Sequence, residues 1–477
     1  MSYCRTQHCS TMYRAVLRLC RKQVLPNSIQ RWNQECRLLG LSVDSSSKRL
    51  ASNTATSPSK SSYESLVERK LFLKTAFARS ATAKVAAVTT VDGGKNVEIK
   101  WDDGSISKYH SMWLRQSCHC PSCRLSTNQP IVNFMDVNID ATVSDARLDG
   151  DKVLKVIWSD DKNHMGLFPV PFLKHYSYSD KSLTEIKNQR KMVFSSEAQI
   201  PEVAYSDVMG SDTGLFQWLN HLNKYGICLV KNVPTQEMTI KKVVERIAPI
   251  QSSVYGEIFD VKDTPQPINF AYTPVRLELH MDQPMYESPP GLQFLHCLRF
   301  DKQVTGGKNF FVDLFHVAHR LREEYPKEFQ DLVRIPVNWE TVHYDRDFPV
   351  HMSYQRPHIS LNSDGEIVGV TWHPGLGGPL LVKEEDVEPY FRAYKVMATL
   401  LNNFPSQYRH RMQEGDMISF NNRRVLHGRE SYNPHDGIRH YQGCYVQIDE
   451  FKSQVQVFSN KIGDGKLATR VGNLDLQ

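Results

Sequence analysis

The feature that most constrains the fold is the order of strand-like and helix-like segments after residue 200. Strand-like stretches, for example at 226–233, 291–300, 416–420 and 439–449, are separated by long and irregular insertions, several of which have helical periodicity. Strict alternation of strand and helix, the pattern of a parallel sheet, is not present. We therefore expect a mainly β fold with flanking helices, of the α+β class, in which a double-stranded β-helix (jelly roll) forms the larger domain.

The region before residue 180 has a different pattern. Short strand-like pieces alternate with Asp-Gly turn signals near residues 92, 103 and 149, which is typical of small antiparallel sheets. We expect a small β-rich N-terminal domain here. The expected organisation is a mitochondrial presequence at 1–42, a disordered linker and lead-in at 43–83, the N-terminal β domain at 84–180, the jelly-roll domain at 195–460 and a C-terminal tail at 461–477.

The charge of the chain is concentrated at its start. Residues 1–42 account for the whole formal net charge of +6, because they contain seven Lys or Arg residues and one acidic residue. A formally neutral body does not favour nucleic acid as a partner. Arg14, Arg18 and Arg21 follow helical spacing in a segment poor in acids, which resembles a mitochondrial presequence; a disordered basic tail on a cytoplasmic protein is the alternative. No stretch approaches the ~18–20 apolar residues of a membrane span, so we expect no transmembrane segment.

Three cysteines lie within six residues, Cys118, Cys120 and Cys123, in an expected loop. Such clustered thiolates favour a soft metal, and zinc needs a fourth ligand to complete a tetrahedron. Candidates for the fourth ligand are His110, His119, His164 and His175. We favour His164, because it follows a strand and turn that can fold back over the loop. Four protein ligands leave no open position, so this Zn(II) is expected to be structural.

A second set of possible metal ligands lies in the larger domain. His280 and Asp282 are two residues apart at strand spacing, so both side chains should emerge on one face, and His427 follows a later strand. Two histidines and one carboxylate leave three positions of an octahedral Fe(II) open for a bidentate oxo acid and O₂. Arg439, at the start of another strand, suits the far carboxylate of such an acid. The set predicts 2-oxoglutarate. A similar tripeptide begins at His343, which shows that a His and an Asp at this spacing are by themselves weak evidence for a metal site.

Several segments resemble the family of Fe(II)/2-oxoglutarate oxygenases that contains the gamma-butyrobetaine and trimethyllysine dioxygenases. The segments are NFAYT (269–273), HMDQP (280–284), PPGLQFLHC (289–297), TGGKNFFVD (305–313), LHGRESY (426–432) and RHYQGCY (439–445). The resemblance implies that His280, Asp282 and His427 bind iron, that Arg439 and Asn269 bind 2-oxoglutarate, and that ascorbate keeps the iron ferrous. It also implies that Cys118, Cys120, Cys123 and His164 bind zinc.

The same resemblance implies a small quaternary-ammonium substrate, hydroxylated at a C–H bond. Such a cation has no N–H to donate, so aromatic faces must bind it. The residues that resemble the family's cage are Tyr255, Phe259, Tyr272 and Tyr445. The expected reaction is the conversion of gamma-butyrobetaine to L-carnitine, with trimethyllysine hydroxylation as the alternative. A non-catalytic, zinc-stabilised binding protein is the alternative of another class, and a homodimer is expected from the size of the chain.

Overall fold

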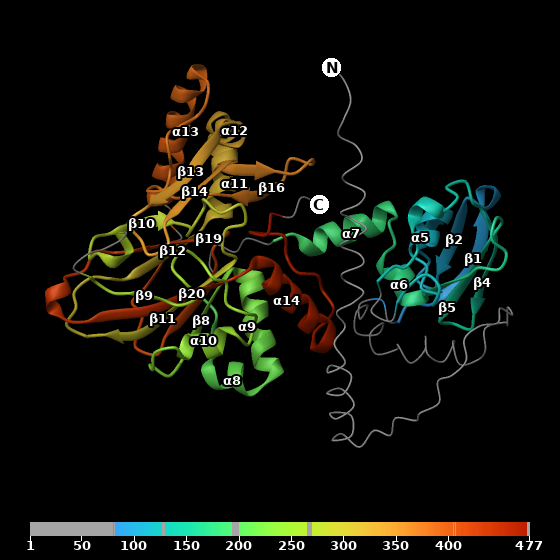
Figure 1. Cartoon of the computed structure of the whole chain (residues 1–477), viewed down its shortest axis with the longest axis horizontal. Helices are drawn as coiled ribbons and strands as arrows, with labels where there is room; N and C mark the ends of the chain where they lie inside the picture. Colours follow the sequence, from blue (N-terminus) through green and yellow to red (C-terminus); the bar gives the residue numbers. More distant parts are fainter. Residues whose placement is uncertain are drawn as a thin grey trace, which may run out of the picture. The chain divides into compact units, whose positions relative to one another are not determined.

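The computed structural model describes residues 80, 82–125, 129–192, 200–264, 270–403, 405 and 407–474. The expected presequence, most of the expected linker and Asn269 lie outside the described residues. Within them, mostly antiparallel sheets combine with helices (Figure 1), so the prediction of the α+β class is confirmed. None of the helices in these ranges combines the length and the apolar character that crossing a membrane requires.

The N-terminal region contains two three-stranded antiparallel sheets. Their strands are β1 Val85–Val91, β2 Asn96–Trp101 and β3 Ile106–His110 in one, and β4 Val143–Asp149, β5 Val153–Trp158 and β6 Met165–Pro169 in the other. The β4–β5 hairpin turns at Gly150, whose φ of 58° suits a residue without a side chain. The core contains Trp101, Tyr109 and Trp158, each at most 1% exposed. The helices α5 Ser111–Gln116, α6 Val170–His175 and α7 Asp180–Arg190 complete this part.

The larger of the two main sheets has the strand order β7-β8-β18-β11-β20-β9, and only the β7–β8 pair is parallel. Its strands are β7 Glu202–Ala204, β8 Ile227–Lys231, β9 Phe259–Val261, β11 Leu292–Phe300, β18 Met417–Asn421 and β20 Arg439–Val446. Four helices lie between or directly after these strands in the chain: α8 Tyr205–Gly210, α9 Asp212–Tyr225, α10 Thr239–Val244 and α14 Ile448–Ile462. Buried residues of α9, α10 and α14 share one apolar cluster with this sheet, so the helices cover one of its faces.

The second main sheet has the order β10-β19-β12-β17. Its strands are β10 Leu277–His280, β12 Asn309–Asp313, β17 Tyr408–His410 and β19 Val425–Arg429. Phe311 and Val425 of this sheet share an apolar cluster with Leu295, Phe420 and Tyr441 of the larger sheet. The two sheets therefore bury their facing sides against each other.

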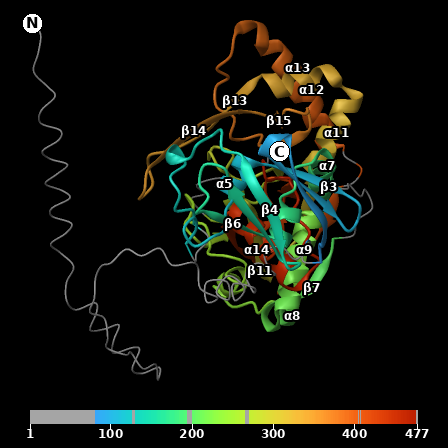
Figure 2. The same ribbon diagram turned by 90° about the vertical axis from the view of Figure 1, so that its right-hand side faces the viewer.

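A third group of elements follows β12. It consists of α11 Leu314–Glu324, α12 Pro326–Arg334, α13 Glu384–Asn402 and the hairpins β13 Pro336–His343 with β14 Val350–Pro357 and β15 Ile359–Leu361 with β16 Ile367–Val370. Figures 1 and 2 both show the three helices grouped beside β13. The segment 314–333 has helical periodicity throughout, but its helix breaks at Pro326, which lacks the N–H that a continuous helix needs and instead begins α12.

Candidate active site and metal centres

His280, Asp282 and His427 converge at one point. His280 ends β10 and pairs directly with His427 on β19, so the two imidazoles lie on adjacent strands. Nε2 of His280 lies 3.4 Å from Oδ1 of Asp282, and Nε2 of His427 lies 4.0 Å from the same oxygen. All three offer ligand atoms within 4.8 Å of one another, which is close enough for one metal ion. The structure thus brings together the three residues that the sequence singled out.

Asp282 is held by two contacts that the sequence did not indicate, one to its backbone and one to its carboxylate. Asp282 lies beyond the end of β10, and the side chain of Asn422 holds its backbone: Oδ1 of Asn422 accepts from the Asp282 N–H at 2.8 Å, and Nδ2 donates to its carbonyl at 3.0 Å. The hydroxyl of Tyr445 donates to Oδ2 of Asp282 at 2.6 Å. Tyr445 was expected only as part of an aromatic cage. Its hydroxyl also orients the carboxylate of Asp282, one of the three candidate metal ligands.

The protonation states at this point suit a divalent metal. Burial raises the pKa of the Asp282 carboxyl, but the hydrogen bond with His280 and the charges of both histidines outweigh it, so the pKa falls well below its usual range. Burial, together with the neighbouring His280, lowers the pKa of His427 to about 3. The site therefore presents a carboxylate and a neutral imidazole, the forms that bind metals.

Arg439 begins β20 and is buried, with 5% of its surface exposed. Its Nη2 donates to Oδ1 of Asn309 at 3.1 Å, whereas its Nε and Nη1 have no partner among the described residues. The guanidinium lies over the ring of Tyr441, at 3.9 Å from its centroid. A buried guanidinium with two unpartnered donor atoms fits a carboxylate ligand, because leaving such donors unsatisfied is costly.

A cavity of about 360 Å³ opens beside His280 and Asp282. Its wall includes all four aromatic residues expected to form the cage, together with His373: Tyr255, Phe259, Tyr272, Tyr445 and His373. The rings of Phe259 and Tyr445 stack with centroids 5.1 Å apart, and Tyr255 lies 5.9 Å from Phe259. The rings therefore form one continuous aromatic surface next to the metal ligands.

The second tripeptide, at His343, has no such environment. His343 ends β13 and is exposed, as are Tyr344 and Asp345. The described ranges contain two groups of metal-ligating side chains, and neither includes this tripeptide. Position in the fold therefore separates the two sequence matches.

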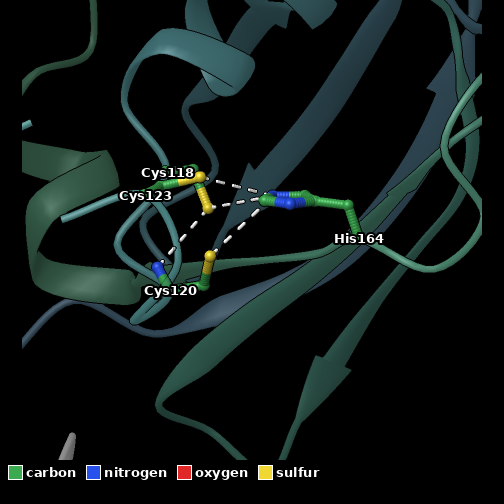
Figure 3. Close-up of side chains that lie close together, drawn as sticks. All are labelled: Cys118, Cys120, Cys123 and His164. Atoms are coloured by element: carbon green, nitrogen blue, oxygen red, sulfur yellow. Dashed lines mark hydrogen bonds between the residues drawn. The ribbon is translucent and has the colours of Figure 1, made fainter. Parts of the chain in front are cut away.

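The cysteine cluster forms a second group of possible metal ligands (Figure 3). The Nε2 atom of His164 lies 3.5 Å from Sγ of Cys118, 3.9 Å from Sγ of Cys120 and 3.6 Å from Sγ of Cys123. Hydrogen bonds from the other thiols lower the pKa of Cys120, and the bond to Cys120 raises the pKa of His164 to about 9. Three sulfurs and one imidazole nitrogen around one centre match the ligands of a closed tetrahedral zinc site.

The other candidate histidines lie elsewhere. His110 caps α5, because its Nδ1 accepts a hydrogen bond from the N–H of Met112 at 3.2 Å. His119 packs edge-on against Phe172 at 4.4 Å, and His175 packs against Tyr176. Only His164 among the four candidates is grouped with the thiols.

Two histidines paired across antiparallel strands, a carboxylate grouped with them, an adjoining aromatic cavity and a buried arginine on another strand are the features of non-haem iron oxygenases that use a 2-oxo acid. Comparison with protein families agrees. Residues 184–445 match the family described as "Taurine catabolism dioxygenase TauD, TfdA family", and residues 88–174 match "Gamma-butyrobetaine hydroxylase-like, N-terminal".

Relatives narrow the class further. The gamma-butyrobetaine dioxygenase of Pseudomonas sp. (strain AK-1) is 33% identical over 366 residues, which is 76% of this chain and 93% of the relative. The gamma-butyrobetaine dioxygenase of Homo sapiens is 30% identical over 79% of this chain and 97% of its own length. The mitochondrial trimethyllysine dioxygenase of Mus musculus is 27% identical over 73% of this chain and 82% of its own length. The chain belongs to the gamma-butyrobetaine dioxygenase family and is a 2-oxoglutarate-dependent dioxygenase.

Proposed function

We propose that this enzyme hydroxylates gamma-butyrobetaine to L-carnitine. The observation that carries the proposal is the placement of the aromatic cavity directly beside His280 and Asp282. Relatives that bear the name gamma-butyrobetaine dioxygenase support the choice of substrate. We further propose that the two main sheets form the double-stranded β-helix of the catalytic domain.

The roles of the site residues follow from their chemistry. His280, Asp282 and His427 would hold Fe(II), and Arg439 would hold the far carboxylate of 2-oxoglutarate. When bound, the iron supplies, with 2-oxoglutarate and O₂, the oxidising power for attack on a C–H bond. Asn269 remains a proposed cosubstrate ligand, and ascorbate a proposed reductant of the iron.

The cage residues would bind the trimethylammonium end of the substrate. Each aromatic face contributes ~0.5–2 kcal/mol of cation–π attraction to such a cation. The stacked rings of Phe259 and Tyr445 lie in the same wall as the iron ligands. A bound trimethylammonium group would therefore fix the distance between the cation and the carbon that reacts, and this positioning is the main contribution of the chain to catalysis.

Comparing two substrates tests the proposal. Purified enzyme with Fe(II), ascorbate and 2-oxoglutarate should release succinate and hydroxylated product with gamma-butyrobetaine, and little with Nε-trimethyllysine. Preference for trimethyllysine would replace the proposed substrate with the alternative, and turnover of neither would refute both. Binding of Fe(II) is tested by the charge-transfer absorption with 2-oxoglutarate under anaerobic conditions, which His280→Ala should abolish and the matched exposed variant His343→Ala should preserve.

Three further proposals concern the rest of the chain. The group of Cys118, Cys120, Cys123 and His164 would bind a structural Zn(II). The basic, acid-poor residues 1–42 would direct the protein to mitochondria. Two copies of the chain would form a dimer, and light scattering of the purified protein tests this directly.

A further inference from the structure

Arg429 lies on the strand that carries an iron ligand, two residues after His427. It is buried, with 4% of its surface exposed, and although the charge of Asp263 acts on it, the two side chains form no salt bridge. Its guanidinium is charged at neutral pH. A buried charge that no carboxylate contacts directly is costly unless other groups solvate it.

The groups that solvate this charge are three backbone carbonyls of one short segment. Nη1 of Arg429 donates to the carbonyl of Ala271 at 3.1 Å, and Nη2 donates to those of Thr273 at 2.5 Å and Val275 at 2.7 Å. The carbonyls belong to alternate residues, and the planar fork of a guanidinium can reach all three, which a single ammonium group cannot easily do. These bonds hold the whole segment to β19.

The segment that Arg429 holds is part of the substrate cavity. Ala271, Tyr272 and Val275 all line it. A separate bond, from the N–H of Tyr432 to the carbonyl of Pro274 at 3.1 Å, joins the same segment from the other side. Arg429 itself is not among the residues that line the cavity, so it would influence the cavity through its hydrogen bonds to this segment.

We propose that Arg429 is a positioning residue that sets the substrate affinity of this enzyme by fixing the wall at residues 271–275, and with it Tyr272, to the strand of His427. The assignment of the affinity effect rests on the proposed function. The competing interpretation places Arg429 in the anion site with Arg439, since both guanidiniums lie over the ring of Tyr432, at 5.0 and 5.5 Å. The two interpretations predict effects on different ligands.

Steady-state kinetics separate them. In Arg429→Met, KM for gamma-butyrobetaine should rise about tenfold or more, which corresponds to at least one lost hydrogen bond to a charged group. KM for 2-oxoglutarate and the iron charge-transfer band should stay within about twofold of wild type. Arg429→Lys keeps the charge and part of the hydrogen bonding. Its KM for gamma-butyrobetaine should therefore lie between those of wild type and Arg429→Met. A rise in KM for 2-oxoglutarate equal to that for the betaine would overturn the proposal in favour of the anion site.

Hydrogen exchange provides a readout that does not depend on the substrate. Peptides covering residues 270–277 should exchange faster in both Arg429 variants than in wild type. Arg246→Met is the matched control, because Arg246 also donates to two backbone carbonyls, those of Val208 and Ser211. Arg246, Val208 and Ser211 are not among the residues that line the cavity. Unchanged exchange in both Arg429 variants would refute the positioning role. If wild type fails to convert gamma-butyrobetaine, the proposed function fails, while the exchange result still decides the role of Arg429.

Discussion

In the proposed site, the hydroxyl and the ring of Tyr445 would act on different ligands, the iron and the betaine, and the substitution Tyr445→Phe separates the two roles. The ring lies in the aromatic wall of the cavity and stacks on Phe259, whereas the hydroxyl donates to Oδ2 of Asp282 at 2.6 Å. Burial and the adjacent carboxylate raise the pKa of Tyr445 well above its usual value, so the hydroxyl keeps its proton and remains a donor. The variant should therefore weaken iron binding and leave the recognition of the betaine intact.

The expected size of the effect follows from the geometry. A buried hydrogen bond to a charged group contributes ~1.5–3 kcal/mol, which corresponds to roughly 10–150-fold in an equilibrium constant. Because the bond is already formed without a metal, only its part in orienting the carboxylate should affect iron affinity. We therefore expect the lower end of this range, a loss of about tenfold in Fe(II) affinity, as is typical when a residue that orients a metal ligand is removed.

Anaerobic titration with Fe(II) in the presence of 2-oxoglutarate measures this affinity through the charge-transfer band. KM for gamma-butyrobetaine, measured at saturating iron, should change by no more than about twofold because the cation–π surface is retained. Tyr390→Phe is the control: it removes a buried hydroxyl 3.3 Å from Nε2 of His358, outside the cavity. Normal iron affinity together with a raised betaine KM in Tyr445→Phe would refute the reasoning.

Three other substitutions test separate parts of the structure. His164→Ala should abolish binding of one equivalent of zinc, measured by metal analysis, and lower the melting temperature by about 5 °C or more. Arg439→Met should raise KM for 2-oxoglutarate by roughly 100-fold, because two charge-assisted hydrogen bonds are lost, with little change in KM for the betaine. In Gly443→Ala the new Cβ would lie 2.4 Å from Cε2 of Phe259, so the ring must move and the betaine KM should rise about tenfold, with the iron band unchanged. Gly377→Ala, where nothing lies within 4 Å of the new Cβ, should behave like wild type.

Local patterns in the sequence predict the elements that depend on near neighbours. The helical periodicity of residues 213–226 matches α9, where Ser211 accepts a hydrogen bond from the N–H of Gly214 and Gly226 ends the helix with a φ of 75°. The strand expected from Arg439 is β20. His280 and Asp282 do share one group of possible metal ligands, as their spacing suggested, although β10 ends at His280 and Asp282 follows it. In each case the residues that form the pattern lie close together in the sequence.

Contacts between distant segments leave no such signal. Asn422 holds the backbone of Asp282 across 140 positions, and Arg429 holds residues 271–275 across more than 150. An asparagine or arginine beside a strand is normally read as a turn or surface residue. Only the pairing of β10 with β19 places both residues at the site, and that pairing depends on the packing of the whole domain.

The strand β20 shows how a simple period arranges the chemistry of the site. Arg439, Tyr441, Gly443 and Tyr445 alternate along it, so their positions face the same side of the sheet. Six residues at ~3.3 Å each separate the two ends of this row by about 20 Å. The guanidinium at one end lacks partners for two donor atoms, and the tyrosine at the other end lies against Asp282 and the cavity. Gly443, between them, leaves room for Phe259 to stack on Tyr445. The proposed anion-binding group and the proposed cation-binding ring therefore stand at different ends of one strand, so the two ligands would not compete for the same side chains.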